Sequence, residues 1–148
     1  MEKWNMVRVL ALGIFDILHL GHLYYLNQAK KLGDELVVVV ASDSKDNLKN
    51  EETDKTIFPD LVRLEIIKSL KPVDQAVLNN GRDFYKVIKD LEPDIIALGY
   101  DQKCDILKLK TELNKIGLNA KVKRLPKHPN SLLSSGKIIH KIISRDWT

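Results

Sequence analysis

Two histidines three residues apart, His19 and His22, stand in a glycine-containing segment that begins at Gly13. The residues before this segment, 7–12, are mostly apolar and indicate a buried strand, whereas the apolar residues after it recur at helical spacing up to Gly33, a plausible helix C-terminus. Both histidines are therefore expected in the first turn of a helix, where unpaired N–H groups and the helix dipole favour an anion. This placement predicts a phosphate site.

The histidine pair admits two readings besides phosphate binding. It could hold a metal ion, but the chain has only two further histidines and one cysteine, and no glutamate lies nearby. It could also be purely structural, yet a histidine is a poor residue at a helix N-terminus unless an anion offsets the dipole.

Other common phosphate and nucleophile motifs are absent or weak. The chain lacks the Gly-x-x-x-x-Gly-Lys-Ser/Thr loop of P-loop proteins and the Gly-x-Gly-x-x-Gly turn of dinucleotide-binding folds. Ser134-Ser135-Gly136-Lys137 fits the Ser-x-x-Lys pattern of serine acyl-enzymes, but a two-residue match arises often by chance and the accompanying motifs are missing.

Short apolar runs alternate with stretches of helical periodicity along the rest of the chain. Further strands are predicted over residues 36–41, 73–78, 94–98 and 121–125, and helices over 59–71, 84–91, 106–116 and 134–143. The alternation predicts an α/β fold, a single Rossmann-like doubly wound domain over residues 1–148 with a five-stranded parallel sheet. Ligands of such sheets bind beyond the carboxyl ends of the strands, which here carry segments 13–22, 42–55, 99–102 and 127–137.

Composition places the chain among ordinary globular proteins, with 44% hydrophobic and 30% charged residues. The apolar run Leu36 to Ala41 is too short to cross a bilayer, and the first residues do not resemble a signal peptide, so a cytoplasmic location is expected. Cys104 is the single cysteine, which excludes an intrachain disulfide. The net charge of +4 is concentrated from Lys121 onward, an excess that could attract nucleic acid, an acidic membrane surface or a small polyphosphate, or could simply be a solvated basic surface.

The histidine segment also carries a family motif. Gly13-x-Phe15-Asp16-x-x-His19-x-Gly21-His22 resembles, at every fixed position, the motif of the cytidylyltransferase-like nucleotidyltransferase family. A second family motif, a Ser/Thr-rich start to the last helix after a basic residue, is similar to Lys127 followed by Ser134-Ser135-Gly136-Lys137. Within the family the resemblance is nearest to archaeal FAD synthases, on segments 71–74, 92–102 and 117–120.

This resemblance implies transfer of AMP from ATP to FMN, with FAD and pyrophosphate as products. The attacking group is already an anionic phosphate, so neither a general base nor a covalent nucleophile is needed. The protein must instead hold two phosphorylated substrates in line and offset developing charge. Mg²⁺ or another divalent cation is expected with ATP, because it prefers phosphate oxygens and demands few protein ligands. No dedicated metal site, nucleic acid or membrane partner is predicted, and a homodimer stays open because relatives often dimerise.

The resemblance also assigns site residues. The catalytic group is His19, His22, Arg63 and a loop lysine, Lys49, with Lys55 as its alternative. The binding group is Gly13, Ile14, Phe15, Asp16, Gly21, Gly99, Tyr100, Asp101, Lys127, Ser134, Ser135 and Lys137. Asp16 is expected either to anchor the phosphate loop or to act as a turn residue. Tyr100, Asp101 and the adjacent Gln102 either contact the base or form a simple loop.

Some positions depart from the family pattern and keep rival functions open. Ile14 replaces a usual Thr, Gly136 replaces a usual Ser or Thr, and residues 50–56 lack a basic run. The rivals with the same chemistry are a CTP-dependent glycerol-3-phosphate cytidylyltransferase and a pantetheine-phosphate adenylyltransferase. A non-catalytic nucleotide- or RNA-binding protein is a rival of another class, although the basic C-terminal stretch has few aromatic residues on which bases could stack.

Overall fold

The fold is built on a five-stranded parallel sheet, seen in a computed structural model that describes residues 5–43, 56–129 and 134–145. The strands are β1 (Arg8–Gly13), β2 (Glu35–Val40), β3 (Gln75–Leu78), β4 (Ile95–Leu98) and β5 (Lys121–Arg124). Their order is β3-β2-β1-β4-β5, and each neighbouring pair is parallel. The predicted sheet is therefore confirmed.

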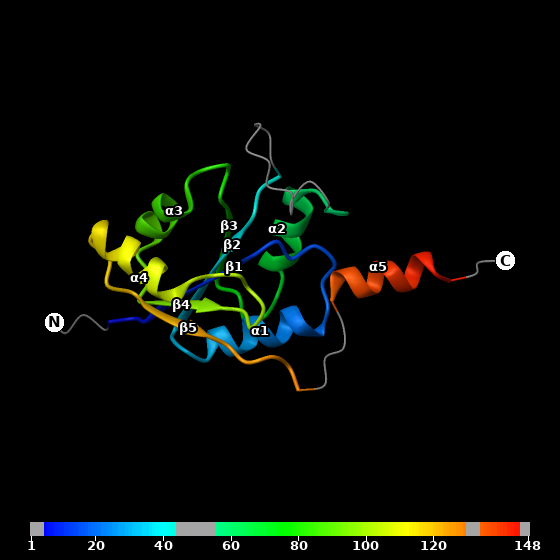
Figure 1. Cartoon of the computed structure of the whole chain (residues 1–148), viewed down its shortest axis with the longest axis horizontal. Coiled ribbons are helices and arrows are strands. Elements are labelled where there is room, and N and C mark those ends of the chain that lie inside the picture. The colour runs from blue at the N-terminus through cyan, green and yellow to red at the C-terminus, as the bar shows by residue number, and fades with distance from the viewer. Residues whose placement is uncertain (1–4, 44–55, 130–133, 146–148) are drawn as a thin grey trace.

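Helices cover both faces of this sheet (Figure 1). They are α1 (Leu20–Lys30), α2 (Asp60–Lys68), α3 (Phe84–Leu91), α4 (Ile106–Lys115) and α5 (Ser135–Ile143). Alternate residues of β1 belong to two hydrophobic cores, one on each face of the sheet. Val9 and Ala11 pack with α1 and α2, whereas Leu10 packs with α3 and α4. This two-sided packing is the doubly wound arrangement that the sequence predicts, and it explains why residues 9–12 of β1 and 36–40 of β2 are apolar on both faces.

The structure corrects the predicted role of Gly33 as the left-handed end of the first helix. The C-cap residue of α1, Lys31, has a right-handed conformation, and Gly33 does not have the positive φ of a left-handed helix end. Its small size matters instead, because a Cβ atom there would lie 2.6 Å from the Val7 carbonyl oxygen. The predicted glycine end occurs on α4, where Gly117 has a φ of 80° and the Leu118 N–H donates to the Leu113 carbonyl.

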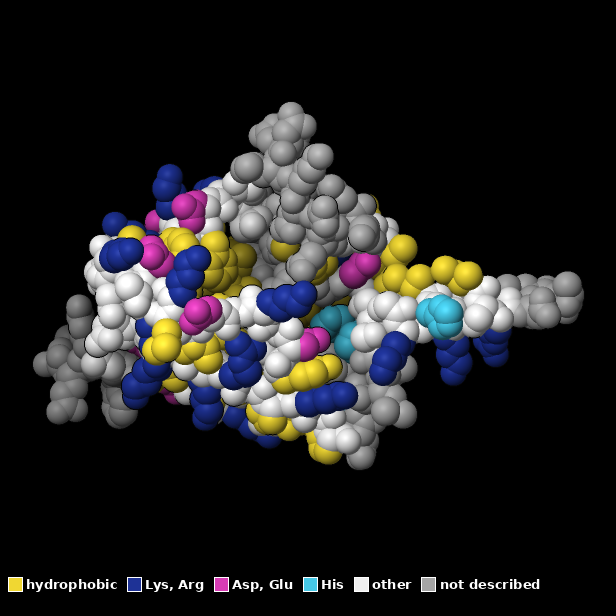
Figure 2. Space-filling model, viewed as in Figure 1, with side chains coloured by type: hydrophobic (Ala, Val, Ile, Leu, Met, Phe, Trp, Pro, Cys, Tyr) yellow, Lys and Arg dark blue, Asp and Glu magenta, His cyan; other side chains and the backbone are white. Residues whose placement is uncertain are grey.

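Helix α5 stands apart from the rest of the fold. It projects beyond the sheet in Figure 1, and none of its residues is buried. Hydrophobic side chains run along one of its sides in Figure 2, and Ile142 and Ile143 are 51% and 77% exposed. Across the described ranges, no helix has the length and apolar character needed to span a membrane.

The order of the strands locates the ligand crevice. The chain leaves β1 toward β2 on one side and later returns to β4 on the other, so the strand order reverses between β1 and β4. The segments that follow β1 and β4 therefore meet at one end of the sheet. The predicted loop lysines, Lys49 and Lys55, lie outside the described residues.

Candidate active site

The segment after β1 is shaped by Phe15. This residue has a φ of 54°, a left-handed conformation that costs a bulky residue on the order of 1 kcal/mol. Its buried ring packs edge-on against His22, with centroids 5.5 Å apart, and lies so close to Gly13 that a Cβ atom there would sit 2.9 Å from it. The glycine and the strained phenylalanine together turn the chain toward the start of α1.

His19 and His22 cap the N-terminus of α1. His19 is the N-cap residue, and its Nδ1 accepts from the Gly21 N–H at 3.1 Å. His22 reaches back, and its Nδ1 accepts from the His19 N–H at 3.3 Å. The pair thus forms a capping box, which satisfies helix N–H groups that would otherwise lack partners. The two rings lie against each other at a tilt, with centroids 3.8 Å apart and planes inclined by 31°.

These contacts fix the protonation of the pair. Because both Nδ1 atoms accept hydrogen bonds, the proton of each neutral ring is assigned to Nε2, the remaining donor for a ligand. Burial and the neighbouring His19 lower the pKa of His22 to about 4, against a smaller opposing effect of Asp16. Burial likewise lowers the pKa of His19, although Asp101 opposes this. At neutral pH the free site therefore presents two uncharged N–H donors, and an anionic ligand would favour their protonated forms.

We expect the depressed pKa of His22 to make stability fall in acid. Between pH 6.5 and about 4, His22 is protonated in the unfolded chain but neutral in the folded chain. The contribution of His22 to the free energy of unfolding is therefore fully present above pH 6.5 and is lost as the pH falls toward 4. Denaturant unfolding at pH 7 and pH 4.5 should show the stability of wild type, relative to His22→Asn, falling by about 1–3 kcal/mol, so that wild type becomes the less stable protein in acid. Carboxylates titrate in both proteins, so a constant difference would show that His22 is not the cause.

Asp16 and Arg63 tie the histidine segment to the start of α2. The two carboxylate oxygens of Asp16 accept from the Ile57 and Phe58 N–H groups at 2.8 and 2.9 Å. The fully buried Arg63 donates to the carbonyls of Ile14 and Phe58, at 2.7 and 3.0 Å, and pairs with Asp43 at 2.8 Å. This geometry favours the anchoring role over the other role predicted for Asp16.

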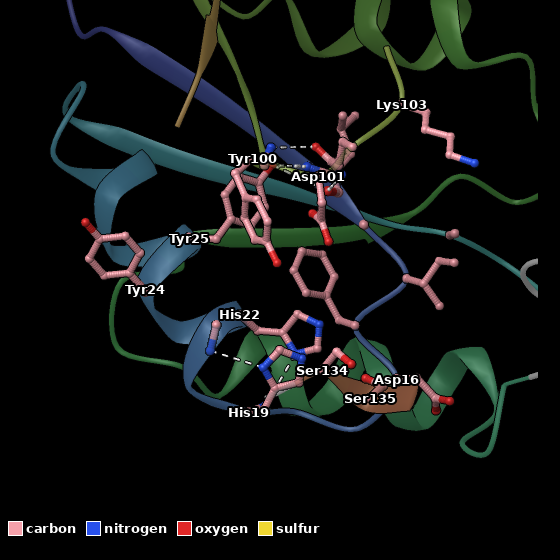
Figure 3. Close-up of a pocket in the computed structure, with 18 of the residues that line it drawn as sticks. Asp16, His19, His22, Tyr24, Tyr25, Tyr100, Asp101, Lys103, Ser134 and Ser135 are labelled. Carbon is pink, nitrogen blue, oxygen red and sulfur yellow. Dashed lines mark hydrogen bonds between the residues drawn. The ribbon is translucent and has the colours of Figure 1, made fainter. Parts of the chain in front are cut away.

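The opposite wall of the site follows β4. Tyr100 is 47% exposed, and the Lys127 Nζ lies 5.5 Å from the centroid of its ring, within range of a cation–π contact. Arg124 holds the loop beneath by donating to the carbonyls of Gly99, Gln102 and Cys104 at 2.7–2.9 Å. Tyr100 and Asp101 therefore stand on a supported loop and face His19 and His22 across the pocket in Figure 3.

The start of α5 completes the wall beside the histidines. Ser134 is the N-cap residue of α5, and its hydroxyl accepts from the Lys137 N–H at 3.1 Å. The Ser135 hydroxyl donates to the Ile17 carbonyl at 3.2 Å, which joins α5 to the segment before His19. Both serines line the same pocket as His19 and His22 (Figure 3). The N-termini of α1 and α5 thus converge on one place, which suits phosphate groups.

A pocket of about 810 Å³ lies between these walls, a size that suits a nucleotide. The structure gathers on it most of the predicted residues: Gly13, Ile14, Phe15, Asp16, His19, Gly21, His22, Gly99, Tyr100, Asp101, Lys127, Ser134 and Ser135. Arg63 and Lys137 do not line it, so their predicted roles in direct contact lack support from this geometry, whereas Lys49 lies outside the described residues. Of the basic C-terminal stretch, Lys121 and Lys123 are exposed on the edge strand.

Sequence reasoning missed several lining residues. They include Tyr24 and Tyr25 from α1, Asn79, Phe84, Lys103 and His128. Tyr25 follows His22 by three residues on one helix, so helical spacing could have placed both rings on the same face. Asn79 and Phe84 follow β3, and the sequence pattern shows no feature that distinguishes their loop from others.

Comparisons with known proteins agree on one family. The model of the family described as cytidylyltransferase-like matches residues 10–141. Relatives named FAD synthase include one from Thermoplasma acidophilum, 49% identical over 138 residues that cover 93% of this chain and 95% of the relative. Another, from Methanohalophilus mahii, is 50% identical over 144 residues that cover 97% and 99%.

Solved structures share the fold. A Thermoplasma volcanium protein described as a lipopolysaccharide core biosynthesis protein is 49% identical, with a TM-score of 0.77 over 84% of this chain and 99% of that one. A pantoate-beta-alanine ligase from Francisella tularensis has a TM-score of 0.62 over 98% of this chain and 74% of that one, at 14% identity. The second likeness shows the fold alone.

Proposed function

Because the chain belongs to the cytidylyltransferase-like family, we propose that it is an FAD synthase, which transfers AMP from ATP to FMN and releases pyrophosphate. The observation that carries this proposal is the identity of about half of the residues, over nearly the whole length of both chains, with relatives that bear this name. The pocket at the histidine segment supports it, since it unites two helix N-termini with a nucleotide-sized cavity.

The described residues can support direct transfer between phosphates. His19 and His22 offer Nε2–H donors at the start of α1, where they can bind phosphate oxygens and stabilise charge that develops during transfer. Ser134 and Ser135 add the N-terminus of α5 beside them. Lys127 brings a positive charge from the opposite wall. The FMN phosphate attacks the α-phosphorus of ATP, the bond to the β-phosphate oxygen breaks, and pyrophosphate leaves with that electron pair.

We propose that the divalent cation, Mg²⁺ in the simplest case, enters with ATP. Within the described residues, no three His, Cys, Asp or Glu side chains cluster as a metal site would require. Asp16 uses both carboxylate oxygens on backbone N–H groups, whereas Asp101 supplies a carboxylate to the pocket. This donor set fits a cation bound chiefly through phosphate oxygens, where it would offset the charge of the triphosphate.

The identity of the substrates is tested by a panel of donors and acceptors. Pyrophosphate release should be fastest with ATP and FMN, compared with every pairing of ATP or CTP with FMN, glycerol 3-phosphate, phosphopantetheine and a sugar phosphate. The sugar phosphate is included because one similar structure is described as a lipopolysaccharide core biosynthesis protein. Turnover of another pair beside silence with ATP and FMN would reject the proposal, and RNA binding without any turnover would favour the non-catalytic rival.

We also propose a cytoplasmic location and a homodimer. A cytoplasmic location suits an enzyme whose substrates are small nucleotides and whose described helices include no membrane span.

The exposed Ile142 and Ile143 on the projecting helix α5 support self-association, because a second copy would remove their apolar surface from water.

A further inference from the structure

The sheet opens between β1 and β4 at the floor of the pocket. Backbone pairing between these strands ends with Ala11 opposite Ala97. On its other side β1 stays paired with β2 as far as Gly13 and Val40. One edge of β1 therefore leaves the ladder early, and the backbone groups of Leu12 that face β4 need other partners.

Tyr25 fills the first gap in the ladder. Its hydroxyl accepts from the Leu12 N–H at 3.2 Å and donates to the Ala97 carbonyl at 2.7 Å, with the Leu12 carbonyl at 3.4 Å as a longer contact. In a regular parallel pair continued from this register, the Leu12 N–H would donate to the Ala97 carbonyl directly. The Tyr25 hydroxyl thus replaces that direct hydrogen bond: it accepts from the Leu12 N–H on one side and donates to the Ala97 carbonyl on the other.

Gln102 fills the next gap in the same manner. Its Oε1 accepts from the Gly99 N–H at 2.8 Å, and its Nε2 donates to the Leu12 carbonyl at 2.8 Å. A continued ladder would join the Gly99 N–H to the Leu12 carbonyl directly. A single oxygen separates the strands at the first rung and a three-atom amide group at the second, so the opening widens toward the pocket.

We propose that Tyr25 and Gln102 are positioning residues that set the opening between β1 and β4 and thereby orient the nucleotide. The proposal rests on the proposed function for the identity of the ligand, ATP. It extends the role of segment 99–102 beyond base contact, because the Gln102 amide is engaged by backbone on both sides. Desolvation of the hydroxyl raises the pKa of Tyr25 well above its ordinary value, so the donor proton is retained.

Two nearly isosteric variants test the proposal, Tyr25→Phe and Gln102→Met. Matched controls outside the pocket are Tyr85→Phe on α3 and Gln75→Met at the exposed start of β3. By amide hydrogen exchange, we expect Leu12 to exchange faster in the first variant and Gly99 in the second, with the β2 amides still protected. By titration calorimetry, each should bind ATP roughly 10- to 100-fold more weakly, because the strand ends that present the site are misplaced.

Coupling between the two residues gives a further readout. Tyr25 and Gln102 both set the same opening between β1 and β4. The double variant should therefore bind ATP only slightly more weakly than whichever single variant has the lower ATP affinity. Neither amide hydrogen exchange nor ATP binding requires the substrate that receives AMP. Both measurements therefore still test this proposal if FMN proves to be the wrong substrate. Unchanged exchange at Leu12 and Gly99, or faster exchange with ATP affinity within twofold of the controls, would overturn the proposal.

Discussion

Replacing His22 with Asn should lower kcat by about 10²- to 10³-fold while the protein keeps its fold. The Asn side chain can place an oxygen near the Nδ1 position, which accepts from the His19 N–H, so the cap of α1 is preserved. It cannot reproduce the Nε2–H, the donor that we assign to the phosphate groups. Steady-state kinetics with ATP and FMN measure the loss, and denaturant unfolding at pH 7 should place the variant within about 1 kcal/mol of wild type.

The complementary variant separates catalysis from capping. His22→Gln can extend a side-chain donor toward the Nε2 position but leaves the His19 N–H without its Nδ1 acceptor. We therefore expect His22→Gln to retain more activity than His22→Asn and to be the less stable of the two. The opposite order in both properties, or equal activity with a loss of folding in both, would support a purely structural histidine pair.

The fold could be predicted from the sequence because its signals are local. Apolar runs such as Leu36 to Ala41 and glycine or proline at helix ends mark each element, and a parallel sheet follows from their alternation. Gly33 shows the limit of such signals. A glycine near a helix end suits a left-handed turn, whereas here it avoids the Val7 carbonyl, a neighbour 26 residues earlier in the chain that sequence spacing does not reveal.

The candidate site likewise contains some residues that a local motif predicts and others that only the complete fold brings together. His19, Gly21 and His22 lie within one motif, and the pocket contains them. Tyr25 escaped functional prediction, and Gln102 was expected only to contact the base or to form a loop. Their contacts join α1 and the loop after β4 to the end of β1, a relation set by strand order. The histidine charge was also unpredictable, since burial lowers the pKa of His22 and burial depends on the complete fold.

Removing the guanidinium of Arg63 should destabilise the protein strongly. Arg63→Leu would leave the carbonyls of Ile14 and Phe58 without their donor and Asp43 without its cationic partner, in a place where the arginine side chain is fully buried. We expect a loss of about 2–4 kcal/mol in the free energy of unfolding. Arg63→Lys keeps the charge but not three fixed donors, so it should lie between wild type and Arg63→Leu. Denaturant unfolding measures all three proteins.

The same variants decide how Arg63 serves the reaction. It does not line the pocket, and its bond to Ile14 holds the segment that carries the histidines, so we expect activity to fall together with stability across the series. Arg82→Leu is the matched control, because the Arg82 pair with Asp90 is exposed and its loss should change stability by less than about 1 kcal/mol. A fully stable Arg63→Leu protein whose kcat has dropped a hundredfold would contradict positioning and restore the direct catalytic role that the family resemblance implies.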